Sequence, residues 1–313
     1  MERKQVIIIG SGPAGYTAAL YTSRAGLNPI IIEGHEPGGQ LTTTTDVENF
    51  PGFPEGVMGP DLMANMRAQV KRFGTEFLST KVKDVNLSKR PFHIVCENGQ
   101  EFLAETLIIS TGASAKYLGL ANEMKLIGKG VSACATCDGF FYRNKIVHVV
   151  GGGDTALEEA NFLTRFASKV YLLHRKEAFR ASKPMQERTF NNPKIEVVWN
   201  TEAQEILFDE SGVTGLKVLN NKSNEITERK TDGFFLGIGH EPNTKFLNGQ
   251  LALDEHGYIK TQGQHPDTSV AGVFACGDVQ DPYYRQAISA AGSGCQAAIR
   301  AERFLESLHD SKA

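Results

Sequence analysis

Two cysteines separated by two residues, Cys134 and Cys137, are the side chains whose types and spacing most clearly indicate chemistry. Such a pair can close a small, strained disulfide that opens when it receives two electrons. Asp138 follows the second cysteine and could supply the proton that this exchange needs. A strand and a glycine loop typical of nucleotide binding begin shortly afterwards, and a hydride carries two electrons. We therefore expect an enzyme that moves reducing power from a nicotinamide to a disulfide.

The other three cysteines, at positions 96, 276 and 295, have ordinary structural interpretations. Each lies in an apolar strand or helix pattern, where a small side chain packs well. Five cysteines in 313 residues do not form the disulfide framework of a small secreted protein. A structural zinc site needs four ligands, and no second close Cys/His pair exists to complete one with Cys134 and Cys137, so we expect no metal.

The composition excludes several classes of protein. Hydrophobic residues make up 41% and charged residues 22% of the chain, as in ordinary soluble proteins. A formal charge of -3 gives no general attraction for nucleic acid or an anionic membrane. The N-terminal apolar run ends in a glycine motif, which disfavours a signal peptide, and no apolar stretch is long enough to span a bilayer. We expect a two-domain cytoplasmic protein with neither nucleic acid nor membrane as a partner.

The chain contains one architectural plan twice, and the first copy starts at the N-terminus. A strand at 5–9 leads through a glycine turn into a helix that runs to about residue 25, and a second strand at 29–32 ends at Glu33. This turn lets the backbone approach a pyrophosphate at the helix N-terminus, and Glu33 would accept hydrogen bonds from ribose hydroxyls. The turn residues predicted to bind the dinucleotide are Gly10, Gly12, Pro13, Ala14 and Gly15.

The second copy has a strand at 145–150, a turn at 151–156, a helix to about 166 and a strand at 169–173. At the position that matches Glu33 it has His174, Arg175 and Lys176, with Arg180 following. An acid there would repel a 2′-phosphate, whereas arginine and lysine would bind one. The substitution favours NADP over NAD, although a solvated basic strand end is the alternative.

A third signal lies near the C-terminus, where an apolar strand at 270–276 ends in Gly277 and Asp278, and a helix starts near Arg285. A carboxylate at this place could hold the sugar or polyol chain of a nucleotide, although Gly-Asp is also an ordinary turn. After each βαβ unit come short strands with polar turns and a closing apolar strand, at 106–112 and 233–239. This alternation predicts layered α/β domains with mainly parallel sheets.

In this order, the motifs resemble the low-molecular-weight, bacterial-type thioredoxin reductases, which belong to the class II pyridine nucleotide-disulfide oxidoreductases. The resemblance extends from residue 6 to about 305. It is carried by the segments 10–15, 38–44, 134–138, 151–156, 174–175, 277–278 and 285–287. It implies two Rossmann-like, three-layer α/β domains, with an NADPH domain (114–241) inserted into a discontinuous FAD domain (1–113 and 242–313).

The resemblance also implies which residues bind the cofactors. Besides the first glycine turn, those expected to contact FAD are Glu33, Gly39, Gln40, Asn49, Gly277, Asp278, Arg285, Gln286 and Ala287. Those expected to contact NADPH are Gly153, Asp154, Thr155, His174, Arg175, Lys176 and Arg180.

The same resemblance implies a homodimer in which NADPH delivers hydride to the flavin and the flavin then opens the Cys134–Cys137 disulfide. Cys137 would lie next to the flavin, Cys134 would attack the disulfide of thioredoxin, and Asp138 would shuttle the proton. The NADPH domain would rotate between the two half-reactions, with hinges at 112–113 and 239–242. Phe140 and Phe141 would help to dock thioredoxin, unless both belong to the core.

Four other functions are weighed against this one. A related flavoprotein could serve another protein partner, but such enzymes commonly carry an additional thioredoxin-like module. A relative that oxidises small dithiols with oxygen needs no NADPH, and Arg175 and Arg180 argue against it. Relatives that reduce ferredoxin lack the cysteine pair. A non-catalytic nucleotide-binding redox sensor remains open from the sequence, and turnover with thioredoxin distinguishes it from an enzyme.

Overall fold

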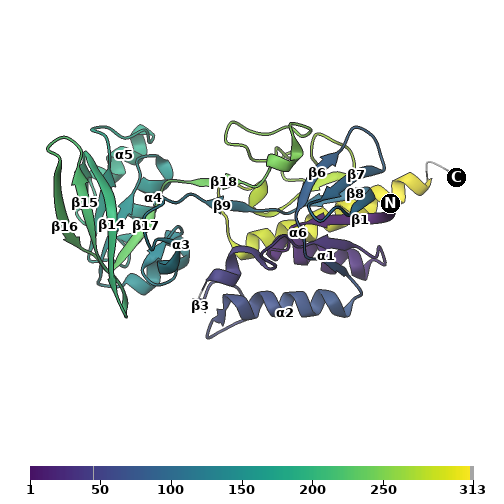
Figure 1. Cartoon of the computed structure of the whole chain (residues 1–313), viewed down its shortest axis with the longest axis horizontal. Helices are drawn as coiled ribbons and strands as arrows, with labels where there is room; N and C mark the ends of the chain where they lie inside the picture. The colour runs from purple at the N-terminus through teal and green to yellow at the C-terminus, as the bar shows by residue number, and fades with distance from the viewer. Residues whose placement is uncertain (45, 311–313) are drawn as a thin grey trace. The chain divides into compact units, whose positions relative to one another are not determined.

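A computed structural model of the chain describes residues 1–44 and 46–310, with the side chains of 309 and 310 left aside. The chain folds into two compact units, which are coloured by residue number in Figure 1. The first unit is discontinuous and comprises Met1–Ser114 and Glu241–Ala313, and the second is the inserted segment Ala115–His240. Both junctions lie one residue from the domain boundaries expected from the sequence.

The first unit is built on a seven-stranded sheet in the order β5-β2-β1-β8-β7-β6, with β19 also paired to β8. Its parallel strands are β1 (Glu2–Ile9), β2 (Ile30–Ile32), β5 (Glu76–Leu78), β8 (Glu101–Ile109) and β19 (Val273–Ala275). The antiparallel strands are β6 (Val82–Asn86) and β7 (Phe92–Cys96). The remaining short elements are η1 (Gly39–Thr43), β3 (Asp46–Val47), β4 (Val57–Met58), η4 (Lys245–Leu247) and η5 (Gly277–Val279).

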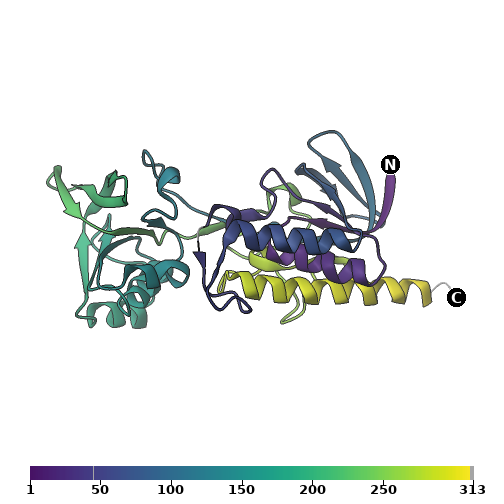
Figure 2. The same ribbon diagram turned by 90° about the horizontal axis from the view of Figure 1, so that it is seen from below.

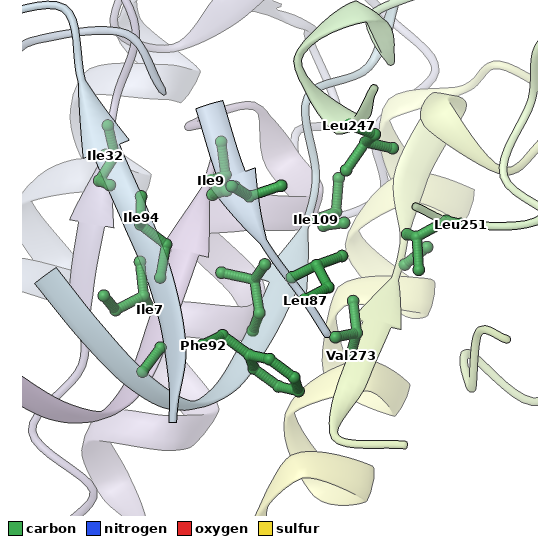
Figure 3. Packing of buried hydrophobic residues seen from close by; sticks show 14 of the residues in the cluster. Ile7, Ile9, Ile32, Leu87, Phe92, Ile94, Ile109, Leu247, Leu251 and Val273 are labelled. Carbon is green, nitrogen blue, oxygen red and sulfur yellow. The ribbon is translucent and has the colours of Figure 1, made fainter. Parts of the chain in front are cut away.

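Successive residues of β1 pack on opposite faces of this sheet, because side chains alternate along a strand. Ile8 packs into the layer of α1 (Pro13–Arg24), α2 (Gly59–Arg72) and α6 (Ala287–Asp310), whose helices lie together in Figure 2. Ile7 and Ile9 belong to the opposite core, shown in Figure 3 with Phe92, Leu247 and Val273. Parallel strands that are buried on both faces explain the unbroken apolar runs in the sequence.

The second unit repeats this plan with a parallel five-stranded sheet in the order β10-β17-β11-β12-β13. Its strands are β10 (Val131–Ser132), β11 (Ile146–Val150), β12 (Lys169–His174), β13 (Ile195–Trp199) and β17 (Gly233–Leu236). The helical elements are η2 (Met124–Leu126), α3 (Ala135–Asp138), η3 (Gly139–Tyr142), α4 (Asp154–Leu163) and α5 (Lys183–Phe190). An antiparallel three-stranded sheet completes the unit, with β14 (Thr201–Asp209), β15 (Gly212–Asn220) and β16 (Glu225–Lys230).

The two chain segments that join the units, β9 (Ala113–Ala115) and β18 (His240–Pro242), pair as a two-stranded ribbon. The residue directly before each strand is a glycine in the left-handed region, Gly112 at φ 69° and Gly239 at φ 89°. A side chain at either position would be strained, so glycine suits this backbone conformation. Within the described residues, no helix combines the length and the apolar character that crossing a membrane requires.

The α/β class and the parallel sheets expected from the sequence are confirmed. One helix start differs from the expectation. Arg285 was expected to open the C-terminal helix, but it adopts a left-handed φ of 46°, and α6 begins two residues later at Ala287. The reversal at Arg285 is part of the site described next.

Candidate redox and dinucleotide sites

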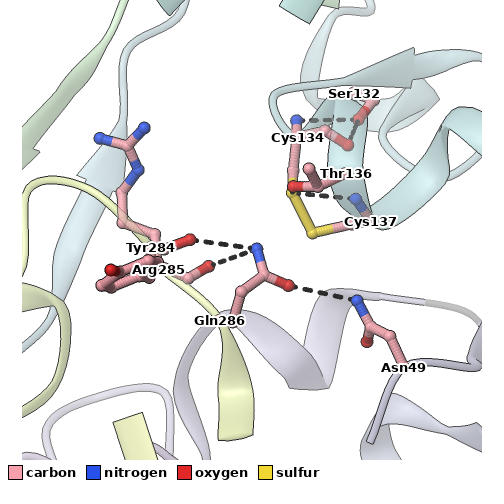
Figure 4. The surroundings of a disulfide bond; sticks show 8 residues. All are labelled: Asn49, Ser132, Cys134, Thr136, Cys137, Tyr284, Arg285 and Gln286. Atoms are coloured by element: carbon pink, nitrogen blue, oxygen red, sulfur yellow. Dashed lines mark hydrogen bonds between the residues drawn. A yellow bond between two sulfur atoms is a disulfide. The ribbon is translucent and has the colours of Figure 1, made fainter. Parts of the chain in front are cut away.

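Cys134 and Cys137 form a disulfide with a Cα–Cα distance of 5.3 Å (Figure 4). Cys134 caps the N-terminus of the short helix α3, and its Sγ accepts a hydrogen bond of 3.2 Å from the backbone amide of Cys137. The Thr136 hydroxyl lies 3.4 Å from the same sulfur. Donors at a sulfur favour its thiolate form, so this arrangement suits Cys134 as the nucleophile once the disulfide is open.

Ser132 connects the disulfide loop with Asp138. Its hydroxyl accepts a hydrogen bond of 3.1 Å from the Cys134 amide (Figure 4). Burial raises the pKa of Asp138 above its ordinary value, and a hydrogen bond from Ser132 partly offsets this rise. A carboxyl that keeps its proton to higher pH is better suited to act as an acid near neutral pH. Sequence reasoning missed Ser132, for which no motif gives a signal.

The two phenylalanines after the disulfide are largely on the surface: Phe140 is 49% exposed and Phe141 38% exposed. Phe140 packs edge-on against Phe166, with ring centroids 6.0 Å apart, and the Arg143 guanidinium lies 4.9 Å from its centroid. The alternative that both are core residues is therefore wrong. The second unit presents an aromatic and cationic surface directly after the disulfide.

The first glycine turn has the geometry that a pyrophosphate requires. A Cβ on Gly10, whose φ is 105°, would lie 2.3 Å from the Ser110 carbonyl oxygen, and one on Gly15 would lie 2.0 Å from the Gly10 carbonyl oxygen. Gly12 caps α1 and has no atom within 4 Å of its own Cβ position, so the start of the helix faces open space. Backbone amides at such a helix start bind anions. The residues here fit a dinucleotide.

Glu33, which was expected to bind the ribose of FAD, is held by protein groups in this structure. Its side chain is fully buried, and both oxygens bind Arg67, at 2.8 Å from Nε and 3.0 Å from Nη2. The Tyr16 hydroxyl donates to Oε1 at 3.0 Å, and the Ser79 hydroxyl donates to Oε2 at 3.3 Å. These four donors match the roughly four acceptor positions of a carboxylate. Glu33 thus forms an internal ion pair with Arg67, and its contact with a ribose stays a prediction.

The other residues expected around FAD come from distant parts of the first unit. The Asn49 amide donates a hydrogen bond of 3.2 Å to Gln286 Oε1, across 237 residues of sequence (Figure 4). Arg285 turns the chain just before Gln286, with its guanidinium donating to the Pro282 carbonyl oxygen at 2.7 Å. Gln40 donates from its amide to the Ala113 carbonyl oxygen, and Gly39 opens η1.

The Gly277–Asp278 turn lies directly against the first glycine turn. A Cβ on Gly277 would lie 2.8 Å from the Cβ of Ala14, so only glycine permits this approach. Burial, helped by the Asp281 carboxylate and opposed by Arg285, raises the pKa of Asp278 to about 6. The structure therefore places the Gly277–Asp278 turn, the third motif found in the sequence, beside the first glycine turn.

The second glycine turn is covered by the basic segment 174–182. The carbonyl oxygen of Gly152 accepts hydrogen bonds from the amides of Arg180 and Ala181, at 2.8 and 3.2 Å. The His174 ring packs so closely on Gly152 that a Cβ there would lie 2.2 Å from the ring. These contacts hold the segment against the start of α4.

The Asp154 carboxylate also holds this segment, since its Oδ1 accepts from the Ser182 amide at 3.0 Å and from the Ser182 hydroxyl at 2.7 Å. Gly153 has no atom within 4 Å of its Cβ position, so the start of α4 faces open space, with Thr155 in its first turn. The cationic side chains of this segment, Arg175, Lys176 and Arg180, are exposed. Cations beside an open helix start fit a phosphorylated dinucleotide.

Comparison with known proteins agrees with this geometry. The sequence matches the family described as pyridine nucleotide-disulphide oxidoreductase over residues 4–294. Thioredoxin reductase of Rickettsia felis is 54% identical over 303 residues, which cover 96% of this chain and 98% of that protein. The structure of thioredoxin reductase from Giardia duodenalis matches with a TM-score of 0.93 at 43% identity, covering 98% of this chain and 100% of that one. The enzyme from Streptococcus pyogenes matches with a TM-score of 0.92 at 38% identity, covering 97% and 99%.

Proposed function

Because the chain belongs to the pyridine nucleotide-disulphide oxidoreductase family, we propose that it reduces the disulfide of thioredoxin with electrons from NADPH, as an FAD-dependent thioredoxin-disulfide reductase. The observation that carries the proposal is the Cys134–Cys137 disulfide in a unit that also contains a basic dinucleotide turn. Relatives named thioredoxin reductase that match over nearly the whole chain support the same conclusion.

The first unit binds FAD and the second binds NADPH. In the first unit, the glycine turn receives the pyrophosphate, and Asp278, Asn49 and Gln286 provide polar groups beside it. In the second unit, Gly153, Asp154 and Thr155 form the start of α4, while His174 and the exposed cations Arg175, Lys176 and Arg180 receive the phosphorylated ribose. When bound, the two cofactors supply hydride transfer, which delivers the two electrons that open a disulfide.

The residues of the chain then carry out thiol chemistry. Two electrons and two protons break the Cys134–Cys137 bond and leave two thiols, and Asp138 holds and moves a proton. The Cys134 thiolate, stabilised by the Cys137 amide and the Thr136 hydroxyl, attacks the thioredoxin disulfide and displaces one of its sulfurs. Cys137 then attacks the mixed disulfide, which releases reduced thioredoxin and closes the Cys134–Cys137 bond again.

Phe140 and Phe141, with Arg143 beside them, form the surface that docks thioredoxin, because exposed aromatic and arginine side chains are typical of interface anchors. The active protein is a cytoplasmic homodimer. The second unit rotates between the two half-reactions about Gly112 and Gly239, two glycines with left-handed backbone that directly precede the joining strands β9 and β18.

The experiment that tests the proposal is an anaerobic titration of the purified flavoprotein. We expect NADPH to bleach the flavin absorbance, and oxidised thioredoxin to restore it repeatedly with excess NADPH. Thioredoxin with both cysteines changed to serine is the control and should restore nothing. If wild-type thioredoxin fails to restore the colour of NADPH-reduced protein, the proposed substrate is wrong.

A further inference from the structure

The hairpin turn between β15 and β16, residues 220–224, contacts the basic segment 174–182. The Asn221 side-chain amide donates a hydrogen bond of 2.8 Å to the carbonyl oxygen of Arg175. The next residue, Lys222, forms an ion pair with Glu177 through its ammonium group. No sequence motif links this hairpin to a dinucleotide site.

The hairpin is itself fixed, so it can hold the segment it contacts. The Asn220 carboxamide oxygen accepts from the amides of Lys222 at 3.0 Å and Ser223 at 3.1 Å. The Asn221 backbone amide donates to the carbonyl oxygen of Asn200 at 2.8 Å. A side chain that is held by its own backbone loses little further entropy when it fixes a neighbour.

The basic segment is secured at its other end by the second glycine turn, through Gly152 with Arg180 and Asp154 with Ser182. Its middle is anchored by Phe179, a buried side chain whose ring centroid is 4.5 Å from that of Trp199. The backbone of Arg175 contacts the hairpin through Asn221, and that of Lys176 contacts Asn200. The first of these contacts is the shorter: the Asn221 side-chain amide is 2.8 Å from the Arg175 carbonyl oxygen, whereas the Asn200 amide is 3.4 Å from the Lys176 carbonyl oxygen.

The ion pair addresses a charge conflict within the segment. Glu177 lies among Arg175, Lys176 and Arg180, and its carboxylate would repel a phosphate group of charge about −2. Lys222 neutralises that carboxylate from outside the segment. Both members are exposed, so the effect on binding is moderate and depends on salt.

We propose that Asn221 and Lys222 are positioning residues for recognition of the 2′-phosphate of NADPH: Asn221 fixes the backbone that carries Arg175, and Lys222 cancels the charge of Glu177. Neither residue needs to touch the cofactor. The inference rests on the proposed binding of NADPH by the second unit, and it adds the β15–β16 hairpin to that site.

The test measures binding to the FAD-loaded full chain by calorimetry, with 2′,5′-ADP and 5′-ADP as probes that differ only in the 2′-phosphate. We expect Asn221→Ala to weaken 2′,5′-ADP binding about three- to tenfold, as for loss of one hydrogen bond. We expect Lys222→Met to weaken it about two- to fivefold at low salt. Binding of 5′-ADP should change less than about twofold in either variant.

Two controls isolate the mechanism. Ser223→Ala alters the same hairpin, and Lys230→Met removes a lysine from the far end of β16; both should preserve the preference for 2′,5′-ADP. The loss caused by Lys222→Met should disappear in a Glu177→Gln background, because the carboxylate it neutralises is then absent. Asn221→Leu, which keeps a similar shape, removes the donor and adds no charge, serves if the alanine variant does not fold.

The outcomes separate this inference from the function on which it rests. If the wild-type protein prefers 2′,5′-ADP and Arg175→Ala removes that preference, the NADPH site stands. Unchanged discrimination in both Asn221→Ala and Lys222→Met then overturns the role of the hairpin alone. If the wild-type protein binds both probes equally, the NADPH assignment and this inference are both wrong. In Asn221→Ala and Lys222→Met, the ratio of the KM for NADPH to the KM for NADH should rise while kcat stays constant.

Discussion

Arg67 binds both oxygens of the buried Glu33 carboxylate, with Nε 2.8 Å from Oε1 and Nη2 3.0 Å from Oε2. Glu33 follows the end of β2, and Arg67 lies on α2, so the pair joins the sheet to the helical layer. The Arg67 guanidinium also lies 4.3 Å from the centroid of the Phe77 ring. This ion pair occupies the place where a dinucleotide fingerprint has its ribose-binding acid.

We predict that this pair stabilises the fold and leaves FAD affinity unchanged. Arg67→Ala leaves a buried carboxylate with fewer donors and should lower the free energy of unfolding by about 1–3 kcal/mol, since Arg67 is itself 39% exposed. Glu33→Gln should lower it as well, and Lys71→Ala on the same helix should not. Urea unfolding measures the loss, and flavin fluorescence measures retention of FAD. If Glu33→Gln lost FAD but kept its stability, the result would show that Glu33 binds the ribose of FAD.

The two cysteines should separate the two half-reactions. Cys134→Ser should still be bleached by NADPH but should not reduce thioredoxin, because the nucleophile is gone. With Cys137 in its proposed role as the thiol that meets the flavin, its remaining thiolate should give a long-wavelength absorbance. Cys137→Ser is the matched control and should lack that absorbance. Thioredoxin reduction by Cys134→Ser would contradict the assigned roles.

Asp138 should matter for proton transfer and not for stability. Burial raises its pKa above the value of the unfolded chain, so the ionised carboxylate at neutral pH weakens folding, and the protonated form does not. Asp138→Asn should therefore retain or increase stability while lowering thioredoxin turnover by about 100-fold or more. The decline of activity as pH rises through the folded pKa should also vanish.

The control for Asp138→Asn is the rate of flavin bleaching by NADPH, which should stay close to wild type. Stopped-flow absorbance separates this step from the thiol steps. A variant that loses stability but keeps its turnover would show that Asp138 is only structural.

The sequence was sufficient for features whose requirements are local. Gly10 and Gly15 have no room for a side chain, and the disulfide needs two cysteines at short spacing, so each motif carries its own reason. The second glycine turn and the cations after it were recognisable from local sequence for the same reason. Parallel strands that are buried on both faces are likewise recognisable as apolar runs.

What the sequence could not provide is the pairing of side chains that lie far apart in the chain. Arg67 is 34 residues from Glu33, and Asn49 is 237 residues from Gln286. Neither separation follows from the periodicity of a helix or a strand, so no local pattern predicts either contact. Asn221 reaches Arg175 only because β12 and the β15–β16 hairpin belong to one folded unit. The fingerprint therefore gave no sign of the ion pair between Glu33 and the distant Arg67.

His148 lies in the middle of β11 and supplies a final prediction about pH. Its side chain is fully buried, and neither ring nitrogen has a hydrogen-bond partner among the described residues. The ring stacks on Tyr171 at 4.8 Å between centroids, and Arg229 lies 5.5 Å from the Tyr171 centroid on β16. Burial, assisted by the charge of Arg229, lowers the pKa of His148 to about 3.

The folded state thus keeps His148 neutral at pH values where the unfolded chain, with an ordinary pKa near 6.5, binds a proton. Between these two values the unfolded state binds more protons, so stability rises with pH and is lost on acidification below about pH 6.5, by at most about 1.4 kcal/mol per pH unit. His148→Phe keeps the stacking on Tyr171 and removes the titration. Its stability should equal or exceed that of the wild type near pH 7, and it should resist acid better.

The measurement is urea unfolding at several pH values from 5 to 7.5, followed by the fluorescence of Trp199, the only tryptophan in the chain, which lies in the same unit as His148. His256→Phe replaces an exposed histidine of the other unit and should leave the pH dependence of this signal unchanged. A His148→Phe protein whose stability falls with acid as steeply as the wild type would show that other groups govern the acid sensitivity of the second unit. A shallower slope would assign part of the acid sensitivity to the buried imidazole of His148.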